Sequence, residues 1–340
     1  MTLHLVTGGS GFIGARVARR LHERGDRVRV IDRIRDPGLP SAIDFRQGSI
    51  CDGAMVADAM RGVDIVHHHA ALVAQSGAGR RYREVNVEGS RTVALEAVRA
   101  GVGAMIHLSS TSIYGMPPPG AITAQTVPHP FEAYGRSKLE AEGIIADICE
   151  AARMPLITIR PRVTLGGGRL GIYQILFQWI AEGRRLYIIG DGKNRQQFIH
   201  VDDLIDFYML ALAQERPGTY NVGTDRFGTL REDLETLIRH AGSASRIVGL
   251  PVGPAIAALA TLRALRLSPL VAWQYRTYHR DCHFDVAPLK AIGWKARYSN
   301  AAMLAESYDW FLTHRHAITM ASAHRSRLPQ RAIGLIRRLS

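Results

Sequence analysis

A tyrosine and a lysine four residues apart, Tyr134 and Lys138 in the segment YGRSK, are the residues whose types and spacing best support catalysis. On a helix, positions i and i+4 lie on one face, so the phenol and the ammonium can meet in one site. A neighbouring cation stabilises the phenolate and lowers the pKa of a tyrosine. Such a tyrosine can exchange a proton with an alcohol while a cofactor moves hydride. Ser109, Ser110 and Thr111 follow a predicted strand, and a hydroxyl there can orient the substrate oxygen.

The segment TGGSGFIG at residues 7–14 places glycines at positions 8, 11 and 14 between a strand-like run and a helix-like stretch. Glycines at this spacing let the chain turn tightly and approach a pyrophosphate, which then faces the helix N-terminus. Asp32 ends the second strand-like run, where an acid binds the adenosine ribose diol and repels a 2′-phosphate. Arg33 and Arg35 follow and can accept a phosphate. The pattern favours NAD and leaves NADP open.

Three consecutive histidines, His67, His68 and His69, raise the question of a metal site. In a strand the first and third side chains point to one face and the second to the other, so three ligands cannot converge. The sequence offers no second ligand cluster at zinc spacing. We therefore expect no metal.

The elements that must position these residues show an alternating pattern over the first 165 residues. Short apolar runs occur at residues 3–6, 28–31, 65–66, 105–108 and 156–159, and longer periodic stretches at 13–24, 83–100 and 134–152. Such alternation predicts an α/β fold, a doubly wound parallel Rossmann sheet with helices on both faces, over residues 1–165.

From residue 166 the pattern becomes irregular, with short strand-like runs at 186–189 and 219–222 and helix-like stretches at 172–182, 203–213 and 230–240. This predicts a smaller C-terminal substrate-binding lobe over residues 166–312 that covers the carboxyl edge of the sheet. We expect residues 197–213 to return in part to the Rossmann core.

Composition limits the class of protein and of partner. Of 340 residues, 46% are hydrophobic and 21% charged, which excludes collagen-like, coiled-coil and disordered chains. Lysine and arginine exceed the acids by 43 − 30 = 13, which favours anionic partners. The basic residues form no aromatic-interleaved stripe, so we expect no nucleic acid. The three cysteines lie far apart and are interpreted as packing residues in a reduced compartment. The sequence leaves a homodimer open.

Two segments bear on location. No signal peptide and no run of eighteen apolar residues is present, so a cytoplasmic protein is expected, peripheral to the inner membrane surface at most. Residues 251–267 are apolar and form either a buried lobe helix or a lid that touches an apolar substrate or lipid. Residues 311–340 contain six arginines, three histidines and no acid. We interpret residues 313–340 as a basic tail that anchors the protein at an anionic surface, the alternative being a solvated extension.

Taken together the motifs resemble those of the extended short-chain dehydrogenase/reductase superfamily, also called the NAD-dependent epimerase/dehydratase family. The resemblance covers residues 1–312 and rests on TGGSGFIG at 7–14, the acid at 32, VHHHAA at 66–71, NVEGS at 86–90, SSTSIYG at 109–115, YGRSK at 134–138, RPRVTLGG at 160–167 and FIHVDDL at 198–204.

The resemblance implies a nicotinamide cofactor and a triad with Ser110 as the hydroxyl, Tyr134 as the acid/base and Lys138 as the group that binds ribose and lowers the tyrosine pKa. Asn86 matches the family asparagine near the cofactor, and Ser49 stands where the family has an acid. The cofactor-binding residues implied are Gly8, Gly11, Phe12, Ile13, Gly14, Asp32, Arg33, Ser49, Ile50, Ala70, Ala71, Asn86, Tyr134, Lys138 and Pro161.

The branch within the superfamily decides the substrate. Nucleotide-sugar epimerases and dehydratases usually carry an asparagine where this chain has Val163 and an arginine where it has Gln196, and both bind the substrate diphosphate. The sequence is therefore more similar to the 3β-hydroxysteroid dehydrogenase-like branch. We expect an NAD(P)-dependent oxidoreductase that interconverts a secondary alcohol and a ketone on an apolar or lipid-like substrate. The alternatives are a nucleotide-sugar epimerase or dehydratase with tightly bound NAD, and a nucleotide sensor without catalysis.

Overall fold

The structure is a computed structural model, and it describes residues 1–168, 170–265, 270 and 272–321. The chain divides into two compact units, each built from several segments. The first unit comprises Met1–Tyr114, Val127–Pro161 and Leu204–Asn221, and the second comprises Gly115–Thr126, Arg162–Asp203 and Val222–Ser340.

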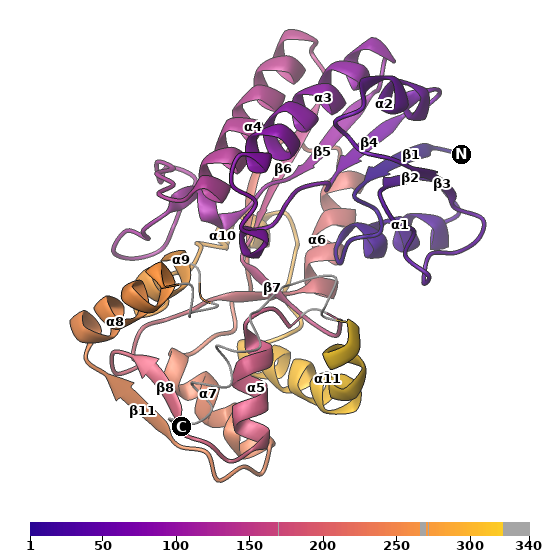
Figure 1. The fold of residues 1–340 in the computed structure, drawn as a ribbon. Helices are drawn as coiled ribbons and strands as arrows, with labels where there is room; N and C mark the ends of the chain where they lie inside the picture. The colour runs from indigo at the N-terminus through magenta and orange to yellow at the C-terminus, as the bar shows by residue number, and fades with distance from the viewer. Residues whose placement is uncertain (169, 266–269, 271, 322–340) are drawn as a thin grey trace. The chain divides into compact units, whose positions relative to one another are not determined.

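The first unit is built on a seven-stranded sheet in the order β10-β6-β5-β4-β1-β2-β3 (Figure 1). The strands are β1 (Leu3–Thr7), β2 (Arg27–Asp32), β3 (Asp44–Gln47), β4 (Ile65–His68), β5 (Ala104–Leu108), β6 (Leu156–Pro161) and β10 (Gly218–Val222). Strands β1 to β6 pair in parallel. Central strands of a parallel sheet are covered on both faces and read as continuous apolar runs, as β1 does with all five residues buried. The predicted doubly wound parallel sheet is confirmed.

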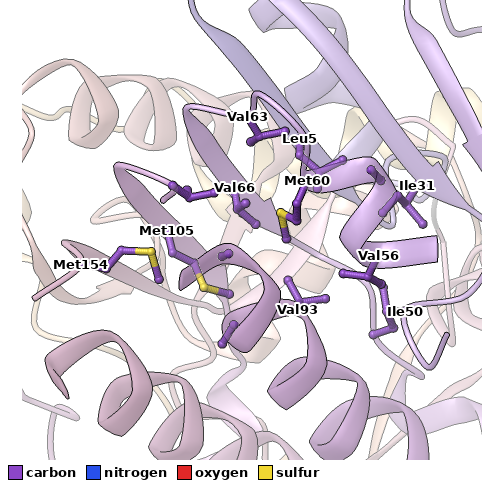
Figure 2. Close-up of a cluster of buried hydrophobic side chains, with 14 of the residues drawn as sticks. Leu5, Ile31, Ile50, Val56, Met60, Val63, Val66, Val93, Met105 and Met154 are labelled. Atoms are coloured by element: carbon purple, nitrogen blue, oxygen red, sulfur yellow. The ribbon is translucent and has the colours of Figure 1, made fainter. Parts of the chain in front are cut away.

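Helices cover the sheet and hold its core. They are α1 (Gly14–Glu23), α2 (Gly53–Met60), α3 (Gly89–Arg99), α4 (Ala133–Ala151) and α6 (Val201–Ala213), with short 3₁₀ turns at Ala74–Ser76 and Thr111–Tyr114 and a π-helical turn at Arg83–Glu88. Leu5, Met60, Val66, Val93 and Met105 meet in one buried cluster between the sheet and these helices (Figure 2). Burying each such side chain contributes about 1.5–3 kcal/mol, so this cluster fixes the layers that carry the site.

The second unit has two small parallel sheets and its own core. Strands β7 (Val163–Leu165) and β9 (Phe198–His200) form one sheet, and β8 (Leu186–Ile189) and β11 (Ile247–Leu250) form the other. The helices are α5 (Tyr173–Ala181), α7 (Leu230–His240), α8 (Val252–Ala264), α9 (Ala272–Thr277), α10 (Ala287–Ala291) and α11 (Asn300–Ala321). Phe177, Phe198, Leu237 and Tyr308 centre its core.

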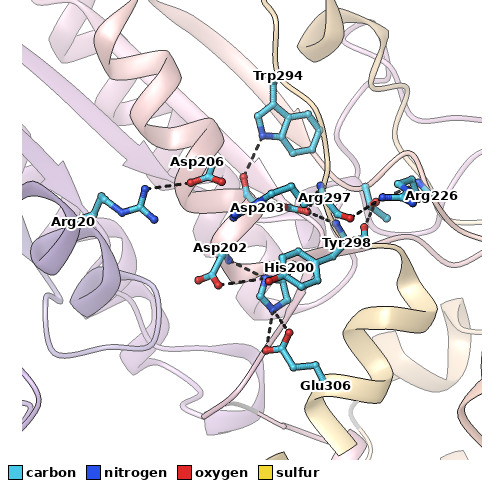
Figure 3. Close-up of polar contacts among 11 residues, drawn as sticks. Arg20, His200, Asp202, Asp203, Asp206, Arg226, Trp294, Arg297, Tyr298 and Glu306 are labelled. Carbon is cyan, nitrogen blue, oxygen red and sulfur yellow. Dashed lines mark hydrogen bonds and ion pairs between the residues drawn. The ribbon is translucent and has the colours of Figure 1, made fainter. Parts of the chain in front are cut away.

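Side chains of the segment FIHVDDL, residues 198–204, make polar contacts that hold part of this unit together (Figure 3). The buried Asp203 carboxylate accepts hydrogen bonds from the backbone N–H groups of Arg297 and Tyr298, each at 3.0 Å. The ring of His200 stacks on Tyr298 with centroids 3.8 Å apart, and its Nε2 lies 3.2 Å from the Glu306 carboxylate. The motif therefore fastens the segment before α11, and α11 itself, to the unit.

The apolar segment at 251–267 is not a buried lobe helix. It forms α8, in which only Ala255 is buried, while Val252 and the following Leu265 are exposed. Residues 266 and 267 lie outside the described residues. Among the helices the structure describes, none is long and apolar enough to cross a membrane.

The structure also bears on two other expectations from the sequence, the start of the basic tail and the burial of the cysteines. The predicted start of the basic tail at residue 313 falls inside α11, which continues to Ala321, and residues 322–340 lie outside the described part. Of the cysteines, Cys149 and Cys282 are buried, but Cys51 is exposed, so it is not a packing residue. Cys51 lies in the connection between β3 and α2, which runs over the surface.

Candidate active site

Lys138 is buried in the first unit and held at the carboxyl end of β5. Its ammonium donates a 2.7 Å hydrogen bond to the carbonyl oxygen of Leu108. Burial lowers the pKa of Lys138 to about 8, and the negative charge of Glu142 opposes this shift. Tyr134, one turn earlier on α4, is half-buried beside Tyr82, with ring centroids 5.9 Å apart. The helix thus presents a phenol and a partly desolvated ammonium at one edge of the sheet.

The serine segment after β5 lies against the start of α4. The backbone N–H and the hydroxyl of Ser112 donate to Oγ of Ser110 at 3.2 and 3.0 Å, and the Thr111 hydroxyl donates to the Pro161 carbonyl at 2.6 Å. A Cβ at position 135 would lie 2.5 Å from the carbonyl oxygen of Ser112. Gly135 is therefore what permits the close approach of the Tyr134 helix to the Ser110 turn.

A buried ion pair braces this arrangement, and sequence reasoning missed it. The Arg160 guanidinium pairs with the carboxylate of Glu142, and its Nη1 donates to the hydroxyl of Tyr114 at 2.8 Å. That hydroxyl donates to Oδ1 of Asn221 at 2.8 Å. The network connects α4, β6, the 3₁₀ turn and β10. The position of Glu142 four residues after Lys138 on one helix face was the available signal.

The glycine-rich turn between β1 and α1 has the predicted geometry. Gly8 adopts a φ of +68°, and a Cβ there would lie 2.7 Å from the backbone N and Cα of Ala70. A Cβ at Gly14 would lie 2.3 Å from the Gly8 carbonyl oxygen. The turn leaves the N-terminus of α1 facing the space above it, with Gly11, Phe12 and Ile13 leading into the helix. Such a turn suits a pyrophosphate.

Asp32 is fixed at the end of β2 beside this turn. Its carboxylate accepts hydrogen bonds from the backbone N–H groups of Ser10 at 2.9 Å and Arg33 at 2.7 Å. Arg33 is exposed. Arg35 donates to the Pro40 carbonyl at 2.9 Å, and its guanidinium lies over the Phe45 ring. Pro40 and Phe45 thus position the Arg35 side chain, and phosphate binding by Arg33 or Arg35 stays a prediction.

The remaining residues predicted to bind the cofactor also lie in the first unit. Asn86 accepts a 2.7 Å hydrogen bond from the Leu72 N–H and donates to the Leu72 carbonyl and to Ser137, so it joins the loop after β4 to α4. Ala70 and Ala71 lie in that loop. Ile50 is buried in the core cluster, and Ser49 Oγ accepts from the Cys51 N–H. Pro161 ends β6. Contact of these residues with a cofactor stays a prediction.

The three histidines alternate across the sheet as the strand period requires. His68 contacts Thr7 and Ser90 at 2.7 and 2.8 Å, whereas His67 and His69 both contact the hydroxyl of Tyr208. Burial lowers the pKa of all three, well below the usual value for His67 and His68. Within the described residues, no group of three or more His, Cys, Asp and Glu side chains is placed to hold a metal ion.

Comparison with known proteins identifies the family. Residues 4–223 match the NAD dependent epimerase/dehydratase family. The chain belongs to this family. NAD is the cofactor of the family, and the glycine turn with Asp32 beside it fits that cofactor.

Relatives carry different names. The chain is 36% identical to the uncharacterized protein y4nG of Sinorhizobium fredii over 96% of this chain and 82% of that protein. It is 28% identical to UDP-glucose 4-epimerase of Streptomyces lividans over 92% and 96% of the two chains. It is 30% identical to 3-beta-hydroxysteroid dehydrogenase of Mycolicibacterium neoaurum over 63% and 62%.

Solved structures share the fold. The structure of UDP-glucose 4-epimerase from Thermotoga maritima with UDP-glucose matches with a TM-score of 0.75 and 23% identity, over 93% of this chain and 100% of that one. At this identity the likeness concerns the fold, which is the Rossmann-like sheet with a smaller C-terminal region.

Proposed function

We propose that the protein oxidises a secondary alcohol to a ketone, or reverses this reaction, with Tyr134 as the proton-transfer residue. NAD, when bound, supplies the hydride acceptor. Tyr134 exchanges the hydroxyl proton, the Lys138 charge stabilises the phenolate, and Ser110 holds the substrate oxygen. The observation that carries the proposal is the buried ammonium of Lys138, pinned to Leu108 one helical turn from Tyr134.

As the substrate class we propose a nucleoside diphosphate sugar. The epimerase relative matches more than nine-tenths of both chains, whereas the hydroxysteroid dehydrogenase relative matches 63% of this chain. The second unit also contains a buried arginine, Arg162, whose Nε and Nη1 donate to the Gln197 carbonyl at 2.9 Å and to the Cys282 sulfur at 3.0 Å. Among the described residues no acidic side chain pairs with it. A buried cation without a carboxylate suits an anionic ligand group.

Gln196 is consistent with this substrate despite replacing an arginine. Its side-chain amide donates to the Arg280 carbonyl at 2.6 Å, so it holds the backbone of the segment around residue 280. The cationic role that the sequence assigns to that position is available instead from Arg162, which lies beside the same segment through Cys282.

A secondary alcohol on an apolar molecule is the second candidate, in line with the 3β-hydroxysteroid dehydrogenase-like branch. Helix α8 favours it, because Val252 is exposed and Ile256, Leu259 and Leu262 are only half-buried, which leaves apolar surface that an apolar substrate could contact.

The decisive experiment compares the two modes of cofactor use. Purified protein is tested for NAD retained through gel filtration, and for conversion of UDP- and TDP-sugars by chromatography. In parallel, added NAD or NADH is followed by absorbance with 3β-hydroxysteroids and ketolipids. Conversion of a nucleotide sugar that falls at least about tenfold in Arg162→Met, but not in Arg195→Met, supports the first candidate. Turnover of added cofactor with apolar substrates alone supports the second, and no turnover with either class overturns the proposal.

A further inference from the structure

A continuous row of hydrogen-bonding side chains crosses the interior of the first unit. Nδ1 of His4 lies 2.8 Å from Nε2 of His67, and Nδ1 of His67 lies 2.5 Å from the hydroxyl of Tyr208. The same hydroxyl lies 3.2 Å from Nε2 of His69. His4, His67 and Tyr208 are each at most 2% exposed. The row therefore runs through β1, β4 and α6 without contact with bulk water.

One end of the row reaches a solvent-facing hollow. Nε2 of His4 lies 3.7 Å from the carboxylate of Asp26. Asp26 lines a hollow of about 400 Å³ together with His22, Arg27, Arg29 and Asp44, around the first residues of β1 and β2. The Asp26 side chain is 17% exposed, although Oδ2, the oxygen that faces His4, is itself buried, so water reaches this carboxylate outside Oδ2.

The other end lies at the opposite edge of the sheet, beside the nucleotide-binding turn. His69 follows β4, its N–H donates to the Thr7 carbonyl at 3.1 Å, and a Cβ at Gly8 would lie 3.0 Å from the His69 carbonyl carbon. Nδ1 of His69 is buried and has no hydrogen-bond partner in the described part of the chain. Burial, and after it the charge of Lys138, lowers the pKa of His69 to about 3.

The carboxylate at the outer end favours one direction for every hydrogen bond. Nε2 of His4 lies 3.7 Å from Oδ2 of Asp26, which is beyond hydrogen-bond distance, but the negative charge there favours a proton on Nε2 and leaves Nδ1 bare. His67 must then donate from Nε2 to His4 and accept at Nδ1 from the Tyr208 hydroxyl, whose oxygen accepts from Nε2 of His69. All three rings are neutral Nε2–H tautomers, and the bare Nδ1 of His69 is left to accept a proton at the cofactor edge.

We propose that these five residues form a proton path from the cofactor edge of the sheet to the hollow at Asp26. A proton accepted at Nδ1 of His69 releases the Nε2 proton to the Tyr208 oxygen, and Tyr208 passes its own to Nδ1 of His67. His67 passes its Nε2 proton to Nδ1 of His4, whose Nε2 proton leaves through Asp26 to water. One proton enters and one leaves, and each ring is left as the Nδ1–H tautomer. Reduction of a ketone runs the same transfers in reverse and restores the Nε2–H tautomers. Resting on the proposed function, the path takes up the proton that an alcohol loses with its hydride.

The charged groups around the row suit this direction. Burial lowers the pKa of His4 at the outer end; Asp26 and Asp64 oppose this shift and Arg24 adds to it. At the inner end the positive charge of Lys138 adds to the effect of burial on the pKa of His69. The charges that surround the row thus favour a proton at the hollow over one at the cofactor edge.

The test uses NAD⁺ alone, so that it does not depend on the substrate. We expect the positive charge of NAD⁺, once bound, to expel a proton from the Tyr134–Lys138 site near pH 8, the value to which burial lowers the pKa of Lys138. A pH indicator dye records this release by stopped flow in weak buffer. Tyr208→Phe removes both hydrogen bonds of its hydroxyl and leaves the ring, and we expect release to slow by about tenfold or more. Added imidazole buffer should restore the rate. The matched control is Tyr220→Phe, which removes a hydroxyl whose one hydrogen bond within the described residues is to the Arg216 carbonyl. This variant should release protons like the unchanged protein.

Two further measurements keep the outcome decisive. His4→Gln, which keeps a hydrogen bond but cannot relay a proton, should slow release in the same way, with thermal melting confirming that each variant folds. ¹⁵N spectra of labelled histidine should show His4, His67 and His69 as neutral Nε2–H tautomers. Unchanged release in a folded Tyr208→Phe, slowed release that buffer does not restore, or Nδ1–H tautomers in the row would each overturn the path. Failure to oxidise any alcohol would overturn the proposed function, but the proton-release and ¹⁵N measurements need no substrate and would still test the path.

Discussion

Tyr134 and Lys138 divide the chemistry between a half-buried phenol and a buried ammonium whose pKa is lowered to about 8 by burial. Because the lysine is tied to the Leu108 carbonyl, its charge stays beside α4 whatever the substrate. Tyr134→Phe removes one hydroxyl and little packing, so we expect turnover to fall by about 10²–10⁴ while NAD binding is nearly retained. Steady-state assays and calorimetric titration of NAD measure the two effects. Wild-type rates would show that Tyr134 is not the proton-transfer residue.

Lys138→Met differs in kind from that change. The methionine fills the space but removes the charge that lowers the tyrosine pKa and that is expected to bind the cofactor ribose. We predict weaker NAD binding together with lost turnover, measured by the same titration. Equal NAD affinity in the two variants would contradict the ribose role.

We predict that Asp32 controls the choice between NAD and NADP through its charge. The carboxylate is held by the N–H groups of Ser10 and Arg33, and a fixed negative charge there would repel a 2′-phosphate. Asp32→Ala removes this repulsion and leaves Arg33 exposed to bind the phosphate. We expect the ratio of NADP to NAD affinity to rise by about tenfold or more, measured by fluorescence titration of both reduced cofactors. A wild type that already prefers NADPH widely would contradict the interpretation of Asp32.

The approach of α4 to the Ser110 turn depends on one glycine. A Cβ at position 135 would lie 2.5 Å from the backbone oxygen of Ser112 and 3.0 Å from Pro130, so neither neighbour can yield without moving the helix or the turn. Gly135→Ala should cost about 1–3 kcal/mol of unfolding free energy and reduce kcat more than the affinity for NAD. Urea unfolding and steady-state kinetics check this, with Gly143→Ala, where a Cβ meets open space, as the control on the same helix.

Helix α8 bears on whether the protein contacts a membrane surface. Of its large apolar side chains Val252 is exposed and Ile256, Leu259 and Leu262 are half-buried. The basic segment at 311–340 lies mostly outside the described residues. We propose that both contact an anionic membrane surface, since each basic side chain near such a surface contributes about 1 kcal/mol that salt screens. The full chain should sediment with anionic vesicles at low salt and release in part at high salt. A chain ending at Thr313 should bind more weakly. No binding at low salt, or no effect of truncation, would leave α8 as a surface with another partner.

At the scale of the molecule, the buried histidines make stability depend on pH. Burial lowers the pKa of His4, His67, His68, His69 and His107, that of His69 to about 3. Below about pH 6.5 these histidines bind protons in the unfolded chain but stay neutral in the folded chain. Their contribution to stability is therefore present above that pH and is lost as pH falls towards their pKa values in the folded state. Between its unfolded and folded pKa values, each such histidine lowers the free energy of unfolding by about 1.4 kcal/mol for each pH unit of acidification. Urea midpoints should change little between pH 7 and 8 and fall steeply from pH 6.5 to 4.

His107 provides the matched test of that slope. Both of its ring nitrogens are buried without a hydrogen-bond partner in the described part of the chain, and the ring stacks on His68. His107→Phe keeps the stacking and removes one titrating group, so the pH dependence should become shallower by about one proton. Stability at pH 7 should not fall. An unchanged slope would show that the buried histidines are not the origin of the acid sensitivity.

The sequence by itself determined what depends on neighbours along the chain. The glycine spacing of 7–14, the acid that ends β2 and the four-residue step from Tyr134 to Lys138 follow from local backbone geometry, and the apolar alternation predicted the parallel sheet. It left the burial of α8 open and misjudged that of Cys51, because residue type alone does not state what packs against a segment.

Only the tertiary structure decided which distant polar groups meet. Arg160 pairs with Glu142 on another element. Arg162 donates to Cys282, which lies 120 positions away in the sequence, and Tyr208 contacts His67, 141 positions away. These pairings have no sequence period. They form because the sheet and helices exclude water, after which each buried donor and acceptor must find a partner among whatever groups the fold brings within reach.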